Sequence, residues 1–354
     1  MTEPVRPLEI ATALRQRVIG QDAAVKELSI ALAKKLQGLT TGNVLMIGSS
    51  GTGKTTLMRA IERWLESRND PAQTWPLIRV HANVLAEEVS RDRPGEAIVV
   101  RLLERARERD AGLGPDELLA RASHGLVFVD EVDKIRSHIA GEPNTTGIRA
   151  QEALLTLIEN EALSIELPEW AGGGRTTVDA AGILFVAAGA FEGLYDTVYD
   201  RVTIGEDRGS LEALSVFEEA GTVTQEMHFS LRDWLKYEDL FDYGMTPQFL
   251  ARFDSLVLLD ALSEDVLVEI FLEDPESGLQ QAREYFSSLG VEMAISPAAV
   301  RRIAREAAGQ PRLGARALKE AFRRVMREIE FDPRATAGNA LMVDLPEVEK
   351  ALEG

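Results

Sequence analysis

The sequence predicts an α/β fold in which helices flank a parallel sheet, followed by a smaller, mainly helical unit at the C-terminus. Short apolar runs alternate with helical segments up to about residue 262, which is typical of a parallel sheet covered on both faces. One such run leads into a glycine-rich turn, and another ends in two acidic residues. Beyond residue 262 helical segments predominate, so we expect two domains, residues 1–262 and residues 263–354.

The elements of the first domain follow from hydrophobic periodicity and from turn residues. Residues 9–37 predict two helices that are separated at Ile19–Asp22, with Asp22 as the cap of the second helix. The continuous apolar runs predict buried strands, because both faces of a parallel sheet are covered. These strands are expected at 43–47, 76–81, 125–129 and 182–188, and further helices at 54–67, 96–109 and 150–161.

The second domain is expected to combine helices with two short strands. Its helices are expected at 263–289 with an interruption at Pro275, at 297–308 and at 314–330, and its strands at 291–295 and 340–345. Two stretches of the first domain have the composition of irregular structure. Residues 200–230 are acidic and weakly patterned, which is typical of a long surface excursion, and Trp170–Arg175 is typical of a hairpin turn.

The composition argues against several kinds of site and partner. The chain has no cysteine and only four histidines, so disulfides are excluded and a metal centre of nitrogen and sulfur ligands is not expected. The formal net charge of -19 opposes binding to the phosphates of a nucleic acid. The longest apolar run, Gly182–Phe191, is too short to cross a bilayer, and no signal peptide opens the chain. We therefore expect a soluble, cytoplasmic protein without membrane or nucleic-acid partners.

The glycine-rich turn reads Gly48-Ser-Ser-Gly-Thr-Gly-Lys54-Thr55, which fits the Walker A pattern GxxxxGK[ST]. Its glycines allow successive backbone N–H groups to face phosphate oxygens, at the N-terminus of the helix that follows. Lys54 is expected to contact the β- and γ-phosphates, and the Thr55 hydroxyl to bind Mg²⁺. The residues predicted to contact ATP are Gly48, Ser49, Ser50, Gly51, Thr52, Gly53, Lys54, Thr55 and Thr56.

The apolar run Gly125–Val129 ends in Asp130 and Glu131 and fits the Walker B pattern, about 75 residues after the glycine-rich turn. A buried strand that ends in two acids can deliver one of them to Mg²⁺, while the other polarises the attacking water. We therefore expect Asp130 to be a Mg²⁺ ligand and Glu131 to be the catalytic base. The two patterns together predict an ATPase.

These segments resemble the Clp-type AAA+ unfoldases, of which ClpX and HslU are members, from Val18 to about Asp332. Val18-Ile-Gly-Gln-Asp22 looks like the family's adenine-pocket segment, which implies that Val18 and Ile19 contact the nucleotide. Asp130-Glu-Val-Asp-Lys134 resembles the extended Walker B segment of ClpX. Two further stretches, Gln151–Glu159 and Ile183–Phe191, are similar to the segments that lead to and through the sensor-1 strand.

The resemblance also assigns roles to two arginines. Arg252, in Thr246-Pro-Gln-Phe-Leu-Ala-Arg252-Phe, falls on the family's arginine finger, which acts across a subunit boundary. Arg316, in Leu313-Gly-Ala-Arg316-Ala-Leu-Lys319, falls on sensor 2, which contacts the nucleotide from the small domain. The resemblance therefore implies an AAA+ core with a C-terminal lid domain, and an ATPase that uses ATP and Mg²⁺. It further implies a homo-oligomeric ring, expected to be a hexamer, whose sites are shared between subunits.

Three departures from the family concern the substrate rather than ATP. The stretch Glu88–Gly95 replaces the family's aromatic Gly-Tyr-Val-Gly pore loop and contains no aromatic residue, while its Arg91 and Arg93 favour acidic partners. The stretch Val202–Ser210 replaces the ClpP-docking loop without its hydrophobic residue, so no ClpP-type peptidase is expected as a partner. The zinc-binding N-terminal domain of ClpX is expected to be absent, because the sequence contains no cysteine.

These observations favour an ATP-driven protein-remodelling machine that acts on a dedicated protein partner without ClpP. Two alternatives stay open: a general unfoldase that feeds a protease, and a nucleotide-switched assembly or signalling module that hydrolyses ATP slowly. A DNA-directed motor is opposed by the net charge. The client, and whether it is threaded through a pore, are not identified by the sequence.

Overall fold

The computed structural model describes residues 4–39, 41–68, 75–84, 96–139, 141–159, 162–204, 215–219, 222–226, 231–333 and 340–353. Contacts divide the chain into two compact units. The first unit consists of residues 1–41, 48–74 and 259–354, and the second of residues 42–47 and 75–258. The predicted division into domains after residue 262 stays a prediction.

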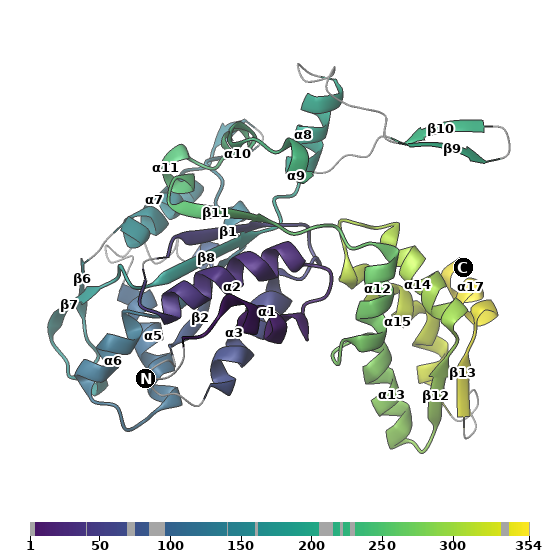
Figure 1. Cartoon of the computed structure of the whole chain (residues 1–354), viewed down its shortest axis with the longest axis horizontal. Helices are drawn as coiled ribbons and strands as arrows, with labels where there is room; N and C mark the ends of the chain where they lie inside the picture. Colours follow the sequence, from purple (N-terminus) through teal and green to yellow (C-terminus); the bar gives the residue numbers. More distant parts are fainter. Residues whose placement is uncertain are drawn as a thin grey trace. The chain divides into compact units, whose positions relative to one another are not determined.

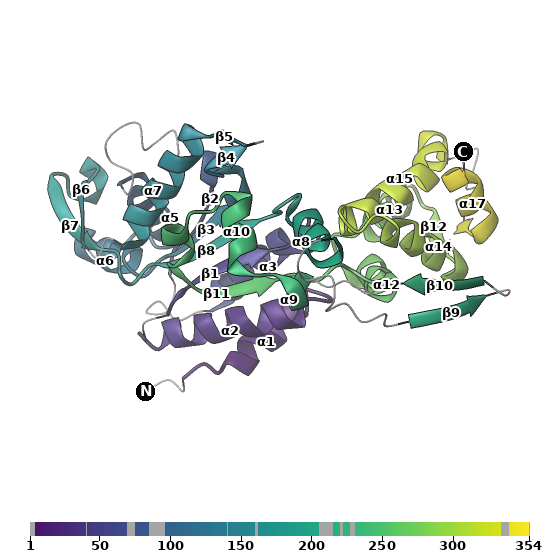
Figure 2. The same cartoon turned by 90° about the horizontal axis from the view of Figure 1, so that it is seen from above.

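A five-stranded parallel sheet forms the centre of the second unit. In order across the sheet, its strands are β11 (Phe253–Leu258), β1 (Asn43–Ile47), β8 (Leu184–Gly189), β3 (Leu126–Asp130) and β2 (Leu77–His81) (Figures 1 and 2). The three inner strands are apolar and almost wholly buried, as parallel strands covered on both faces must be. The predicted α/β fold with a parallel sheet is confirmed, although the sequence pattern did not predict β11.

The helices of the second unit share one large apolar core with this sheet. They are α5 (Glu96–Arg109), α6 (Pro115–Ala122), α7 (Thr145–Glu159), α8 (Leu194–Thr203), α9 (Leu231–Trp234), α10 (Tyr237–Tyr243) and α11 (Pro247–Leu250). Helix α7 starts earlier than the predicted residue 150, because Asn144 precedes it and its Oδ1 accepts a hydrogen bond from the Gly147 N–H at 3.2 Å. Short helices such as α6 and α11 were not predicted from the sequence, since a few residues carry little periodicity.

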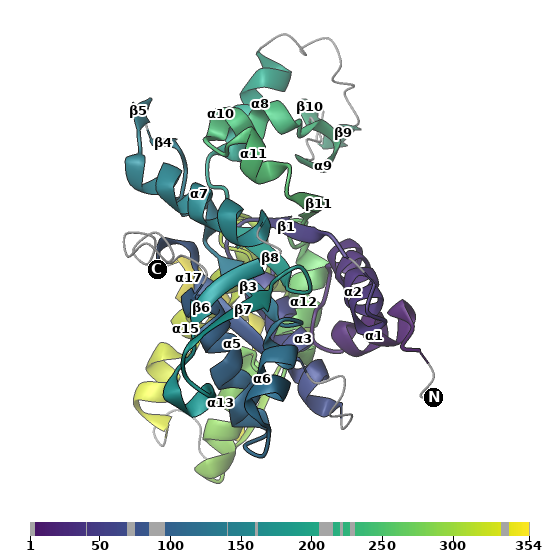
Figure 3. The same ribbon diagram turned by 90° about the vertical axis from the view of Figure 1, so that its left-hand side faces the viewer.

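Hairpins complete the described part of the second unit. They are β4 (His138–Ile139) with β5 (Glu142–Pro143), β6 (Ala162–Glu166) with β7 (Arg175–Asp179), and β9 (Ser215–Glu219) with β10 (Thr222–Glu226). The hairpin β6–β7 lies beside α5 (Figure 3), and its connection includes Trp170, so the predicted hairpin turn is confirmed. The hairpin β9–β10 falls within the predicted excursion at 200–230. Short 3₁₀ turns follow β3 at Val132–Lys134 and β6 at Glu169–Ala171.

The first unit combines helices from both ends of the chain. From the N-terminal part come α1 (Pro7–Arg15), α2 (Asp22–Leu36) and α3 (Lys54–Ser67). From the C-terminal part come α12 (Glu264–Glu273), α13 (Gly278–Ser288), β12 (Glu292–Ile295), α14 (Pro297–Ala308), α15 (Ala315–Phe331), β13 (Ala340–Val343) and α17 (Leu345–Glu353). The C-terminal elements (Figure 2) share an apolar core, which confirms the mainly helical C-terminal region. No helix in the described ranges is long and apolar enough to span a bilayer.

The start of α2 corrects one prediction. Gln21 occupies the cap position, and Asp22 is the first residue of the helix. The Asp22 carboxylate accepts a hydrogen bond from Arg15 Nε at 2.6 Å instead of capping the helix. The prediction failed because an acidic residue is favoured in the first turn of a helix as well as at its cap.

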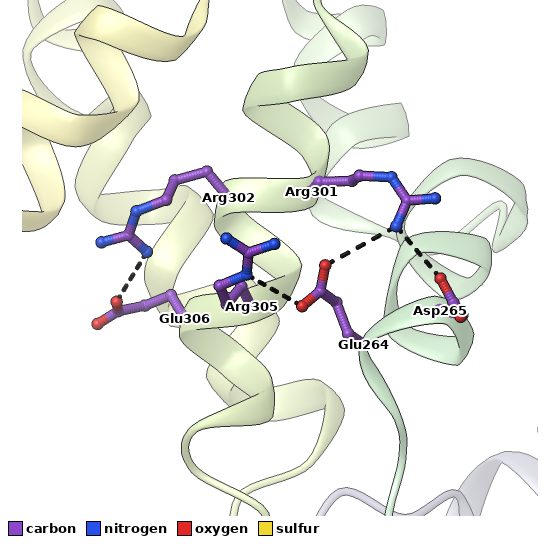
Figure 4. A network of polar contacts seen from close by, with 6 residues as sticks. All are labelled: Glu264, Asp265, Arg301, Arg302, Arg305 and Glu306. Carbon is purple, nitrogen blue, oxygen red and sulfur yellow. Dashed lines mark hydrogen bonds and ion pairs between the residues drawn. The ribbon is translucent and has the colours of Figure 1, made fainter. Parts of the chain in front are cut away.

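A network of ion pairs joins the start of α12 to α14 (Figure 4). The Glu264 carboxylate lies 3.2 Å from Arg305 Nε and 3.8 Å from Arg301 Nη1, and Asp265 lies 3.3 Å from the same Arg301 atom. Exposed pairs of this kind contribute about 0–1 kcal/mol each, because water screens them. The packing of α12 on α14 therefore depends chiefly on their buried apolar faces, which belong to the C-terminal core.

Lys35, in α2, is a cation with only 4% of its surface exposed. Burial lowers its pKa from 10.5 to about 7. Between these two pH values the unfolded chain binds a proton at this residue that the folded chain does not, so stability rises as the pH is raised from about 7 towards 10.5. A pKa difference of one unit corresponds to about 1.4 kcal/mol. Burial of this ammonium group therefore lowers the free energy of unfolding by several kcal/mol near neutral pH.

We predict that Lys35→Met raises the midpoint of thermal unfolding by several degrees at about pH 7.5, and by less at about pH 9.5. The measurement is thermal unfolding followed by circular dichroism at both pH values. Lys34→Met, which changes an exposed lysine of the same helix, is the control and should shift the midpoint little at either pH. If Lys35→Met raised the midpoint equally at both pH values, the lowered pKa of Lys35 would not be the cause of the gain in stability.

Candidate active site

The loop Gly48–Gly53 connects β1 to α3, as the Walker A pattern predicts. Gly51 and Gly53 have positive φ angles of 75° and 106°, which residues with a side chain rarely adopt. The ammonium group of Lys54 donates hydrogen bonds to the carbonyl oxygens of Gly48 and, at 2.8 Å, of Ser49. Thr55 and Thr56 lie in the first turn of α3. Lys54 is the first residue of α3, so its ammonium group and the helix N-terminus both lie at the end of this loop, and both favour an anion.

The start of α15 packs directly on this loop. The Ala315 N–H donates a hydrogen bond to the Gly51 carbonyl at 3.1 Å. A Cβ atom on Gly51 would lie 2.0 Å from the Leu313 carbonyl oxygen, so this approach requires glycine at position 51. Arg316 follows Ala315 and has an exposed side chain. The structure thus brings together two predicted parts of the site, the loop and Arg316, that lie far apart in the sequence.

The predicted adenine-pocket segment also reaches the loop. Val18 is buried and Ile19 is half-buried. Gln21 is buried, and its Nε2 donates a hydrogen bond to the Thr52 carbonyl at 3.0 Å. Sequence reasoning assigned no role to Gln21. The sequence signal that could have found it is a polar residue next to a glycine. In the structure this glycine, Gly20, has a φ angle of 74° and packs against the Val266 side chain.

The two predicted acids lie in the second unit, at the carboxyl end of β3. Asp130 ends the strand and accepts hydrogen bonds from Arg79 Nη2 and, at 2.9 Å, from the Glu131 N–H. Glu131 has a φ angle of 59°, in the left-handed region that non-glycine residues seldom occupy. Such a conformation costs about 1–3 kcal/mol and is found most often at functional sites.

Two residues beside these acids were missed by sequence reasoning. Arg79 pairs with Asp130, and His81 Nδ1 lies 3.7 Å from Glu131 Oε2. Both come from β2, which pairs with β3 in parallel so that His81 is level with Asp130. The sequence contained no signal for them, because the pairing of β2 with β3 is a property of the sheet and not of either strand.

Asp133 holds the turn after β3 to the end of β8. It is 2% exposed, and its Oδ1 accepts a hydrogen bond from the Ala190 N–H at 3.1 Å. Burial, reinforced by the charge of Asp133, raises the pKa of the nearby Tyr243 to about 12. The Tyr243 ring contacts Phe191, with 5.3 Å between ring centroids. The segment Ile183–Phe191, which was predicted to run through the sensor-1 strand, is thus hydrogen-bonded to the Walker B segment Asp130–Lys134.

Arg252 lies at the opposite edge of the sheet from the two acids. It precedes β11, where the Asn43 Nδ2 group donates a hydrogen bond to its carbonyl at 3.1 Å, and its guanidinium group pairs with Glu159. Phe253 pairs with Asn43 at the start of β1, whereas Glu131 follows the end of β3. Five residues of strand span about 16 Å, so Arg252 is beyond side-chain reach of Glu131 in the same chain.

Two predicted substrate segments fall largely outside the described residues. The stretch 88–95, expected to replace the pore loop, lies wholly outside them. Of the stretch 202–210, expected to replace the ClpP-docking loop, the structure describes residues 202–204, which lie at the end of α8.

The side chains predicted to hold Mg²⁺ suit that ion. A threonine hydroxyl at Thr55 and a carboxylate at Asp130 supply hard oxygen donors. Within the described ranges, no group of three or more His, Cys, Asp or Glu side chains could hold a metal by itself. Mg²⁺ is usually held by one or two carboxylates together with water and substrate phosphates.

Comparison with known proteins identifies the family. The family described as AAA domain (Cdc48 subfamily) matches residues 39–256. The chain is 31% identical to the ATP-dependent Clp protease ATP-binding subunit ClpX 3 of Methylococcus capsulatus, over 92% of this chain and 76% of that protein. It is 29% identical to ClpX of Porphyromonas gingivalis, over 96% and 80% of the two chains, and 28% identical to ClpX of Bacteroides fragilis, over 94% and 78%.

Proposed function

Because the chain belongs to the Clp-type AAA+ ATPases, which bind and hydrolyse ATP, we propose that it is a protein-remodelling machine that works on a dedicated protein partner without a ClpP-type peptidase. The relatives named above are ATP-binding subunits of a Clp protease. In this view the chain shares the ATPase activity of these relatives but acts on a different client.

We propose that residues 48–56 bind the phosphates of ATP, with Lys54 neutralising the β- and γ-phosphates. Thr55 and Asp130 would hold Mg²⁺, which supplies positive charge beside the phosphates. Glu131 acts as the base that takes a proton from the attacking water. Val18 and Ile19 contact the adenine, and Arg316 contacts the phosphates. The close approach of Ala315 to Gly51 supports the last assignment, since it sets Arg316 next to the loop.

The position of Arg252 carries the proposal that the protein works as an oligomer. Arg252 lies at the amino edge of the sheet, and the acids that serve ATP lie at its carboxyl edge. If Arg252 stabilises charge on a γ-phosphate, that ATP must belong to another subunit. A head-to-tail arrangement that repeats this contact closes into a ring, and we propose a hexamer.

The sequence at 88–95 and 202–210 supports a dedicated client. An aromatic side chain can grip many different polypeptides, whereas Arg91 and Arg93 favour acidic ones. Glu206 and Asp207 would have to be buried in order to dock on an apolar cleft of a peptidase, which is unfavourable. The acidic composition and the ATPase together favour a cytoplasmic machine for protein substrates.

The test is capture of the client by a variant that binds ATP without hydrolysing it. Tagged Glu131→Gln protein is added with ATP to an extract of the source cell, and Lys54→Ala protein serves as the control that should not bind ATP. One stoichiometric partner, whose addition to the purified wild-type protein stimulates its ATPase, is expected. A broad set of unrelated proteins would indicate a general unfoldase. ATP-dependent polymers without a captured protein would indicate an assembly module.

A further inference from the structure

Gln21 joins the glycine-rich loop to the segment that leads into α12. Its side chain is 2% exposed, and its Nε2 donates hydrogen bonds to the carbonyl oxygens of Thr52 at 3.0 Å and of Asp260 at 2.9 Å. Its Oε1 accepts a third hydrogen bond from the Asp260 N–H at 3.0 Å. All three bonds are made to backbone atoms. A buried amide that is hydrogen-bonded in this way is costly to break, so it holds its partners in a fixed geometry.

The bond to Thr52 orients a peptide group of the loop. The Thr52 carbonyl and the Gly53 N–H belong to one planar trans peptide, so they point in opposite directions. The Gln21 side chain also lies beside Gly53, where a Cβ atom would be 3.9 Å from Gln21 Cγ. Anchoring the carbonyl on Gln21 therefore turns the Gly53 N–H away from Gln21, and such N–H groups are what a loop of this kind offers to phosphate.

The bonds to Asp260 attach the same peptide group to the C-terminal part of the first unit. Residues 259–263 connect β11 to α12. Leu259 touches the start of the loop, because a Cβ atom on Gly48 would lie 2.7 Å from Leu259 Cβ. The side chain of Val266 in α12 packs against Gly20, next to Gln21. A displacement of the connecting segment would therefore pull on the loop through Gln21.

We infer that Gln21 is a positioning residue of the ATP site: it aims the peptide group of Thr52 and Gly53 at the phosphates and couples this group to Asp260. Nucleotide binding and the position of the segment that leads to α12 are thereby linked. The inference rests on the proposed binding of ATP by residues 48–56. It does not depend on the client or on the formation of a ring.

The test compares Gln21→Met with a matched variant, Gln151→Met. Gln151 is 1% exposed and also makes three hydrogen bonds to backbone atoms, but its partners are Ile135, Gly244 and Thr246 in the second unit. Both changes remove a buried amide of the same size. We expect the dissociation constant for ATP, and the KM for ATP, to rise about tenfold in Gln21→Met and to stay near the wild-type values in Gln151→Met.

A second readout separates positioning from a general loss of stability. Hydrogen exchange of the backbone at residues 259–263 is measured with and without ATP. Binding should slow exchange there in the wild-type protein and in Gln151→Met, and this change should disappear in Gln21→Met. Gln21→Asn should behave as Gln21→Met does, because its shorter side chain cannot reach Thr52 and Asp260 together. This second variant serves as the test if the methionine variant does not fold.

Two results would overturn the inference. One is unchanged ATP affinity in folded Gln21→Met and Gln21→Asn proteins. The other is an equal loss of ATP affinity in Gln21→Met and Gln151→Met, which would reflect lower stability alone. Failure of the wild-type protein to bind ATP, or binding that Lys54→Ala does not weaken, would instead contradict the proposed ATP site.

Discussion

Replacing Glu131 with glutamine is expected to lower the rate of ATP hydrolysis by about 10²–10⁴-fold while leaving ATP binding intact. Glutamine has almost the same shape as glutamate but cannot accept the proton of the attacking water. The two residues have similar backbone preferences, so the left-handed conformation at position 131 should be kept. Phosphate release measured at saturating ATP gives the rate, and a fluorescent ATP analogue gives the affinity.

Glu152→Gln is the matched control for this change. Glu152 is an exposed glutamate on α7, in the same unit, and has no role in the proposed chemistry. Its ATPase rate should equal that of the wild-type protein. If Glu131→Gln hydrolyses ATP at the wild-type rate, Glu131 is not the base, and His81 becomes the group to examine, since it lies 3.7 Å from the same carboxylate.

Replacing Arg252 with alanine is expected to lower the ATPase rate about 10³-fold or more, which is the size of effect that an arginine finger has on phosphoryl transfer. In the proposed ring, the loss would arise because the charge that develops on the γ-phosphate bound to a neighbouring subunit would no longer be neutralised. ATP affinity should change little, since Arg252 lies at the far edge of the sheet from the acids of its own chain. Arg149→Ala, which removes an exposed arginine of α7, should keep the wild-type rate.

Mixing two inactive variants tests whether Arg252 acts between subunits. Arg252→Ala subunits keep Glu131, and Glu131→Gln subunits keep Arg252. In a mixed ring, an intact Arg252 can face an ATP that has an intact Glu131, so part of the activity should return. The recovered rate is measured as a function of the mixing ratio, with co-assembly checked by size-exclusion chromatography. Co-assembled rings that recover no activity would contradict a site shared between subunits.

The pairing of Arg252 with Glu159 bears on the size of this effect. Both side chains are partly exposed, at 47% and 37%, so water screens the pair and its net stabilisation is about 0–1 kcal/mol. A phosphate of a neighbouring ATP carries more charge than one carboxylate, and it can therefore displace Glu159. The ion pair is therefore compatible with the role proposed for Arg252.

Local patterns were sufficient to predict a large part of the fold and of the candidate site. The strand at 43–47, the loop that follows it and the helix from Lys54 are neighbours in the chain, so the residues that determine them lie within one short window. The same holds for β3 and its two acids, because Asp130 and Glu131 directly follow the continuous apolar run that forms the buried strand. The roles proposed for Arg252 and Arg316 came from resemblance alone.

The residues that sequence reasoning missed depend on contacts between distant segments. Arg79 and His81 lie beside the acids because β2 is the neighbour of β3. The strand β11 was missed because its apolar run is short and half-exposed, and only its pairing with β1 makes it part of the sheet. Asp22 was expected to cap α2, yet the adjacent Gln21 occupies that position and is turned inward to Thr52 and Asp260.

The sequence by itself determined the fold class and the ATPase family, since a glycine-rich loop of the Walker A pattern and a strand that ends in two acids are each specified by consecutive residues. Only the tertiary structure decided that Ala315 touches Gly51, that Gln21 bridges the loop to Asp260, and that Arg252 stands at the opposite edge of the sheet. The physical reason is that a hydrogen bond between residues far apart in the chain forms only once the strands and helices that carry them have packed. No short window of sequence records which distant backbone group will be the partner.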